Sequence, residues 1–228
     1  MNRLAIIPAR GGSKRLPGKN IVEFRGKPII NWTIEEAVAS DCFDNVLVST
    51  EDEEIRELVE NAGGEVIDRS LELASDKASL VDVGLDVLEQ ESVLGRHYDV
   101  ISFLYATAPL RRREDIAGVV GLIAPGVCDF AMAITRYAHP PHQGLVMASD
   151  GTLAARWPEY IESSEADFGR LWVDNGSTYA MSVEAFCQHK TFYGPGLRGW
   201  PMPFTRSIDI DEREDLELAR YLAGIGDS

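Results

Sequence analysis

Residues 4–20 read LAIIPARGGSKRLPGKN, and this stretch holds the strand and the loop that decide the fold. Leu4–Ile7 is a continuous apolar run, which is typical of a strand buried on both faces of a parallel sheet. The loop that follows contains four cations: Arg10, Lys14, Arg15 and Lys19. Ligands of open α/β sheets bind in the loops beyond the carboxyl ends of the strands. The stretch therefore predicts a parallel sheet with an anion site after its first strand.

The rest of the chain alternates short apolar runs with helical patterns. Apolar runs predict strands at 46–49, 65–67, 100–104, 130–135 and 177–181, and helical spacing predicts helices at 28–39, 51–61, 79–91, 113–123 and 213–223. Such alternation predicts an α/β fold with a doubly wound, mostly parallel, Rossmann-like sheet. The rhythm stops between 137 and 173, where proline and glycine pairs separate short extended pieces. We expect an α/β domain of residues 1–136 and 174–228, interrupted by an excursion of residues 137–173.

The charge of the chain is unevenly distributed. The formal net charge of the 228 residues is -15, yet residues 1–30 hold seven cations against one acid. An acidic body repels nucleic acid, so a small polyanion such as a triphosphate is the expected partner of the basic loop. No apolar run reaches the roughly 18 residues that cross a bilayer, and we expect no membrane contact. The three cysteines form no CxxC pair, which favours a reducing cytoplasm.

The spacing of the basic loop matches neither a Walker A loop nor the GxGxxG fingerprint. Gly11 and Gly12 are expected to bring backbone N–H groups close to an anion and to accept positive φ. The cations add charge, and arginine can hold phosphate oxygens in a bidentate manner. A solvated surface loop is the competing interpretation, but four like charges so close together favour a bound polyanion.

Residues 207–211 read SIDID and predict a second chemical feature. In a strand, positions i and i+2 share a face, so Asp209 and Asp211 would point the same way. Two neighbouring carboxylates repel each other unless a cation joins them. Mg²⁺ prefers oxygen ligands and often combines one or two carboxylates with substrate phosphates. The alternative is that Asp211 caps the last helix together with Glu214 and Asp215.

Together these motifs resemble the CMP-sialic acid synthetase family, the cytidylyltransferases that activate nonulosonic acids. The resemblance is carried by IIPARGGSKRLPGKN (6–20), VLVSTEDEEI (46–55), LELASDKAS (71–79), ATAPLR (106–111) and SIDIDEREDLELA (207–219). It extends from residue 3 to about residue 222. It implies a nucleotidyltransferase fold in which residues 137–173 form a protruding dimerisation arm, and hence a homodimer.

The resemblance also implies an activity, the transfer of CMP from CTP to the anomeric hydroxyl of a 2-keto sugar acid with release of pyrophosphate. In the family, the aspartates that match Asp209 and Asp211 hold the metal, here expected to be Mg²⁺. The implied triphosphate contacts are Arg10, Lys14, Lys19, Gly11, Gly12 and Ser13. The implied cytosine contacts are Ala9, Arg10, Asn20, Ala78 and Ser79. Ser79 is also in position to cap the helix that begins there.

The residues on the sugar side mix two branches of the family. Tyr105 stands where sialic acid synthetases usually carry glutamine, and YATAP (105–109) and PHQ (141–143) resemble the pseudaminate branch. NGSTY (175–179) is nearer to the neuraminate branch. Arg111 is the expected partner of the substrate carboxylate, with Arg112 and Arg113 as competitors. The complete set of predicted sugar contacts is Tyr105, Thr107, Arg111, Gln143, Asn175 and Tyr179.

Two other functions compete with this interpretation. A Kdo-type cytidylyltransferase resembles the chain in its opening loop, but that family usually has proline where Asn20 stands. A non-catalytic CTP-binding sensor is the alternative from a different class. A sensor has no need of a metal pair, so Asp209 and Asp211 favour an enzyme.

Overall fold

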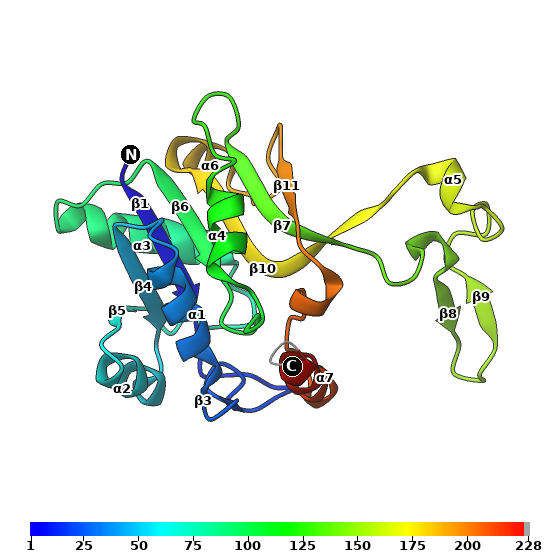
Figure 1. Cartoon of the computed structure of the whole chain (residues 1–228), viewed down its shortest axis with the longest axis horizontal. Helices are drawn as coiled ribbons and strands as arrows, with labels where there is room; N and C mark the ends of the chain where they lie inside the picture. Colours follow the sequence, from blue (N-terminus) through cyan, green and yellow to red (C-terminus); the bar gives the residue numbers. More distant parts are fainter. Residues whose placement is uncertain (226–228) are drawn as a thin grey trace.

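A computed structural model of the chain describes residues 1–225, and at its centre lies a seven-stranded sheet of order β11-β7-β10-β6-β1-β4-β5 (Figure 1). Its strands are β1 (Arg3–Pro8), β4 (Asn45–Thr50), β5 (Glu65–Asp68), β6 (Val100–Leu104), β7 (Phe130–Arg136), β10 (Trp172–Ser182) and β11 (Arg198–Pro201). Within this sheet β10 runs antiparallel to β6 and β7, and every other neighbouring pair is parallel. The predicted mostly parallel α/β fold is confirmed.

Helices cover both faces of the sheet because the strands are apolar on both sides. In β1, Ala5 and Ile7 pack with α1, α2 and α4, whereas Leu4 and Ile6 pack with α3 and α6. The helices are α1 (Ile29–Ala39), α2 (Glu53–Asn61), α3 (Leu80–Val93), α4 (Arg113–Val120), α5 (Glu165–Phe168), α6 (Val183–His189) and α7 (Arg213–Ile225). No helix within residues 1–225 has the length and apolar character needed to cross a bilayer.

The predicted strand at 207–211 is wrong. These residues follow the short 3₁₀ helix η2 (Phe204–Arg206) and belong to no strand. Ile208 and Ile210 are nevertheless buried, in a cluster with the apolar side of α7. The alternation of apolar and acidic residues therefore records packing against a helix, a pattern that strand pairing would also produce.

Strand β10 begins earlier than the predicted strand at 177–181. Its pairing with β7 shifts register between Asp174 and Tyr179, and Gly176 adopts φ +66° within the shift. A Cβ at residue 176 would lie 2.7 Å from Oδ2 of Asp209, so glycine is required there for space as well as for conformation. The first half of β10 is polar and irregular and forms no apolar run, so the sequence did not predict it as strand.

Residues 137–171 leave the sheet between β7 and β10 and extend far to one side of it (Figure 1). This segment contains the 3₁₀ helix η1 (Pro141–Gln143), a hairpin of β8 (Leu145–Met147) and β9 (Leu153–Ala155), and α5. Figure 1 shows the hairpin and α5 well separated from the helices that cover the sheet. A second small hairpin, β2 (Glu23–Phe24) with β3 (Lys27–Pro28), follows the basic loop.

Candidate active site

A cavity of about 510 Å³ opens at the carboxyl ends of strands β1, β5 and β6. Parallel strands all end at the same edge of a sheet, so the loops that follow them meet there. The cavity is lined by residues of loop 8–20, by the segment 69–83 that runs from the end of β5 into the first turn of α3, by residues 105–107 after β6, and by Asp211. The opening loop thus borders a cavity at the place that the sequence predicts.

The basic loop and the acidic tail segment meet in this cavity. Lys19 Nζ lies 2.7 Å from Oδ1 of Asp211, and Arg15 Nη2 lies 2.5 Å from Oδ2 of the same carboxylate. Burial by itself raises the pKa of Asp211, but hydrogen bonds and positive charge from Lys19 and Arg15 together lower it below the ordinary value. Two segments almost two hundred residues apart in sequence therefore form one charged site.

A second carboxylate neutralises the other half of the basic loop. Asp76 accepts from Arg10 Nη1 at 2.9 Å and from Lys14 Nζ at 2.5 Å. Hydrogen bonds from Lys14 and Arg10 hold the pKa of Asp76 below its ordinary value. The cations of the loop are thus paired with carboxylates of the same chain. A polyanion that entered the cavity would replace these carboxylates as the partner of the cations.

Gly11 has a different role from the predicted one. The Gly11 N–H donates to Glu51 Oε1 at 2.9 Å, so it is not free for an anion. A Cβ at residue 11 would lie 2.0 Å from Oδ2 of Asp52, which explains glycine at this position. Gly18, and neither Gly11 nor Gly12, has positive φ in this loop. The expected positive φ of Gly11 and Gly12 is wrong.

Asp209 lies beside the cavity, next to Thr107. The Thr107 hydroxyl donates to Asp209 Oδ1 at 2.5 Å, and the backbone N–H of Ile210 donates to the Thr107 carbonyl at 2.9 Å. Burial raises the pKa of Asp209, although the Thr107 hydrogen bond and the charge of Lys19 act against this rise. The backbone N–H groups of Asp211 and Glu212 donate to the Asp215 carboxylate. Asp215 therefore caps the start of α7, and the Asp211 side chain faces the cavity instead.

The predicted cytosine contacts are only partly brought together. Asn20 and Ala78 line the cavity with Arg10, and the Asn20 side-chain amide donates to the Arg10 carbonyl at 2.8 Å. Ala9 is fully buried in the core. Ser79 accepts from the Asp82 N–H and donates to the Asp82 carboxylate, so its side chain caps α3.

Arg111 is a structural residue rather than the expected carboxylate partner. It is 2% exposed, and its guanidinium donates to the Ser177 carbonyl and to Thr33 Oγ1, the latter at 2.9 Å. Burial lowers its pKa to about 10, which still leaves it charged at neutral pH. Arg111 thus ties the loop after β6 to β10 and to α1, and it does not line the cavity.

The remaining predicted sugar contacts lie in three different places. Tyr105 and Thr107 line the cavity. Tyr179 and Asn175 are buried in β10 behind it, where Tyr179 donates to Asp174 and its ring lies 5.3 Å from that of Tyr105. Gln143 lies on the protruding segment 137–171.

Arg69 and the pairing role of Asp76 are two features of the site that were not predicted from the sequence. Arg69 follows β5, lines the cavity, and donates to the carbonyl of Ser49 at 2.8 Å. Burial lowers its pKa, although the nearby Glu51 carboxylate acts against this. Its place just beyond a predicted strand was a usable signal, because each parallel strand delivers its next residues to the same edge.

The chain is similar in sequence to known cytidylyltransferases. A family model described as cytidylyltransferase matches residues 4–124. The chain is 32% identical to pseudaminic acid cytidylyltransferase of Campylobacter jejuni subsp. jejuni serotype O:2, covering 97% of this chain and 96% of that protein. It is 30% identical to CMP-N,N'-diacetyllegionaminic acid synthase of Legionella pneumophila subsp. pneumophila, with the same coverage of both chains.

A solved structure supports the fold independently. CMP:2-keto-3-deoxy-manno-octonic acid synthetase complexed with CTP superposes with a TM-score of 0.75 over 99% of this chain and 100% of that one, at 19% identity. At this identity the likeness concerns the fold. The family model covers more than half of the chain, and one relative exceeds 30% identity over nearly its full length. The chain belongs to the cytidylyltransferase family and is a nucleotidyltransferase.

Proposed function

We propose that the protein transfers CMP from CTP to the anomeric hydroxyl of a nonulosonic acid and releases pyrophosphate. The observation that carries the proposal is the shared cavity, where Lys19 and Asp211 lie 2.7 Å apart. Nucleotidyl transfer depends on positioning and on charge neutralisation, and this cavity supplies groups of both signs. The relatives that are named as cytidylyltransferases of such sugars support the same conclusion.

The triphosphate would bind to Arg10, Lys14 and Lys19, with Ser13 beside them. Asp76 then loses its two partners to phosphate oxygens. Lys19 is only 23% exposed, whereas Lys14 is 81% exposed, so the charge of Lys19 is the less screened by water. We infer that Lys19 contributes the larger share to holding the phosphates during transfer.

The acidic pair fits a divalent cation. Within residues 1–225 no group of three or more His, Cys, Asp or Glu side chains is placed to hold a metal ion. Asp209 and Asp211 would therefore need phosphate oxygens as additional ligands, which is the arrangement that Mg²⁺ commonly adopts. Desolvation raises the pKa of the half-buried Asp209, which indicates a carboxylate with too little compensating charge, and a cation would supply that charge.

The reaction forms a bond between the sugar oxygen and the α-phosphorus and breaks the bond from that phosphorus to the pyrophosphate oxygen. The hydroxyl proton passes to solvent or to pyrophosphate. Asp209 and Asp211 would hold Mg²⁺, which when bound would supply charge neutralisation and favour ionisation of the attacking hydroxyl. Thr107 orients Asp209, while Lys19 and Arg15 keep Asp211 ionised down to a lower pH.

The proposal is tested with purified protein, CTP, Mg²⁺ and a panel of acceptor sugars. The panel contains pseudaminic, legionaminic and neuraminic acids together with Kdo. Release of pyrophosphate with a nonulosonic acid supports the proposal, and release with Kdo alone favours the Kdo-type alternative. CTP binding without turnover on any sugar favours the sensor.

Tyr105 is proposed to face the sugar. Its side chain lines the cavity beside Thr107, whereas its carbonyl is the part that accepts from Thr33 Oγ1. Because the backbone contact survives substitution, Tyr105→Gln is expected to change the ratio of kcat/KM between two nonulosonic acids by about tenfold, the value of one or two polar contacts. The KM for CTP should stay within about twofold. Equal changes in the sugar and CTP constants would contradict the placement of Tyr105.

We also infer that residues 137–173 form an arm, outside the domain of residues 1–136 and 174–228, that pairs two copies of the chain. Large apolar side chains of the arm are exposed in the single chain: Leu145, Val146, Met147, Leu153, Trp157 and Tyr160. An exposed apolar surface of this kind is typical of a protein interface. Gln143 on this arm would then reach the sugar only in the assembled dimer.

If the arm pairs two chains through its apolar side chains, one charged substitution on the arm should disrupt the dimer. Met147 is 71% exposed at the end of β8, so Met147→Asp is expected to lower the molar mass in light scattering from that of a dimer to that of one chain. Val93→Asp is the matched control, because Val93 is 83% exposed on α3 outside the arm. A wild-type chain that is monomeric at high concentration would contradict the inference.

A further inference from the structure

The two aspartates of the site lie on a segment that has almost no regular structure. Residues 202–211 contain only the short η2 helix, and they reach the cavity from β11 without joining a strand. Other elements hold this segment at both ends. The Met202 carbonyl accepts from Thr135 Oγ1 at 3.1 Å, and Ile210 N–H donates to the Thr107 carbonyl at 2.9 Å.

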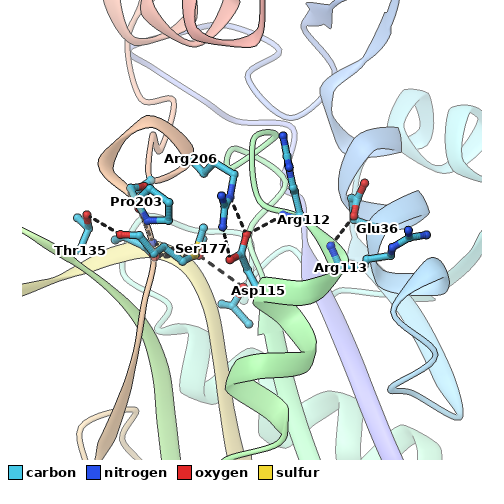
Figure 2. Close-up of polar contacts among 12 residues, drawn as sticks. Glu36, Arg112, Arg113, Asp115, Thr135, Ser177, Pro203 and Arg206 are labelled. Carbon is cyan, nitrogen blue, oxygen red and sulfur yellow. Dashed lines mark hydrogen bonds and ion pairs between the residues drawn. The ribbon is translucent and has the colours of Figure 1, made fainter. Parts of the chain in front are cut away.

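Arg206 lies between these two anchors and forms an ion pair with Asp115. Among the described residues, this is the only ion pair that residues 202–208 make. Arg206 Nη2 lies 2.7 Å from Oδ1 of Asp115 and its Nε lies 3.1 Å from Oδ2, which is a bidentate pair. Asp115 is 2% exposed in the first turn of α4, and it also accepts from the Arg112 N–H at 3.1 Å. Figure 2 shows the Asp115 carboxylate between the Arg206 side chain and the start of α4.

This geometry fixes η2 to a rigid element. Helix α4 packs against β7, β10 and β11 of the sheet, and a carboxylate in its first turn is favoured by the helix dipole. Arg206 and Asp209 are three positions apart in the chain, a distance of at most about 10 Å, so a displacement of η2 passes directly to the Asp209 carboxylate. Metal ligands require placement within about 0.5 Å.

We propose that Arg206 is a positioning residue for the metal-binding aspartates: its pair with Asp115 sets the positions of Asp209, beside the cavity, and of Asp211, in its wall. The inference rests on the proposed function, since it takes these aspartates as the ligands of the divalent cation. Arg206 does not line the cavity, and its guanidinium is used by the Asp115 carboxylate. Its loss therefore acts on the affinity for the metal and only secondarily on CTP.

Removing either partner of a buried ion pair destabilises a protein, so stability alone does not test the proposal. The chain offers a matched control in Glu91 and Arg96. Glu91 is 1% exposed, Arg96 Nη2 lies 2.5 Å from its Oε1, and Tyr98 provides the second donor. This pair lies at the end of α3, away from the cavity.

The experiment compares Arg206→Ala, Arg206→Lys and Arg96→Ala with the wild type. Thermal unfolding is measured first, and both alanine variants are expected to unfold at lower temperature. Binding of Mn²⁺ in the presence of CTP is then followed by its paramagnetic resonance signal, at a temperature where each variant is folded. Arg206→Ala is expected to weaken Mn²⁺ binding at least about fivefold and to raise the half-saturating Mg²⁺ concentration for turnover equally. Arg96→Ala should change neither constant.

Arg206→Lys keeps the charge but cannot form the bidentate pair, so an intermediate Mn²⁺ affinity supports the proposal. Should Arg206→Ala fail to fold, the lysine variant carries the same test. Mn²⁺ affinity equal to wild type in a folded Arg206 variant would overturn the proposal. A wild type that binds Mn²⁺ with CTP but turns over no sugar would refute the proposed function, while the Mn²⁺ comparison would still decide the role of Arg206.

Discussion

Asp209→Asn is expected to reduce CMP transfer about 100- to 1000-fold without unfolding the protein, the range seen when one preorganised charge-stabilising group is lost. The amide keeps an oxygen that can accept from the Thr107 hydroxyl, which lies 2.5 Å from Oδ1 in the wild type. It removes the negative charge that would hold the cation. Pyrophosphate release at saturating Mg²⁺ measures the effect, and activity close to wild type would contradict the metal assignment.

Asp209→Asn is also expected to leave the melting temperature unchanged or to raise it. Burial raises the pKa of Asp209, so the folded protein disfavours the ionised form. The asparagine side chain of this variant carries no charge, and the melting temperature should stay the same or rise at neutral pH. Asp129→Asn is the matched control, because Asp129 also accepts from a hydroxyl, that of Ser182 at 2.6 Å, and the hydrogen bonds of Ser182 and Gly126 lower its pKa. Asp129→Asn should therefore lower the melting temperature and leave turnover unchanged.

The pH dependence of this difference follows from linkage. A carboxyl whose pKa is raised on folding binds its proton more tightly in the folded state, so its unfavourable contribution disappears as the pH falls through the folded pKa. The advantage of Asp209→Asn in melting temperature should thus shrink as the pH approaches 3.8, the ordinary aspartate value. An advantage that grew on acidification would show that the charge of Asp209 is well compensated in the fold.

The sequence predicts the sheet and the cavity well because both depend on local patterns. Apolar runs such as Leu4–Ile7 are buried on both faces of the sheet. The loop after each parallel strand lies at the same edge of the sheet, so its position can be predicted. Lys19 could be placed near the cavity on that basis, whereas Asn20, Tyr105 and Thr107 were expected there from the family resemblance; all four line the cavity.

What the sequence did not predict depends on contacts between distant segments. Arg111 looked available for a ligand, but its guanidinium is used by Ser177 and Thr33, which are 66 and 78 residues away. Gly11 looked like part of an anion cradle, but the Asp52 side chain explains it. Residue types and spacing do not distinguish a buried structural arginine from a ligand-binding one, because both requirements select the same side chain.

Lys19→Gln is expected to lower kcat/KM for CTP about 100-fold, equivalent to about 2.7 kcal/mol, because it removes a partly buried charge at the point where the basic loop meets Asp211. Lys14→Gln should cost less than about tenfold, since Lys14 is 81% exposed and its charge is screened. Lys27→Gln is the matched control: Lys27 is 26% exposed and also paired, with Glu35, but it lies outside the cavity. Steady-state kinetics with varied CTP gives all three values. Equal losses for Lys14 and Lys19 would contradict the graded role assigned to the loop, because burial would then have no influence on how strongly each cation holds the phosphates.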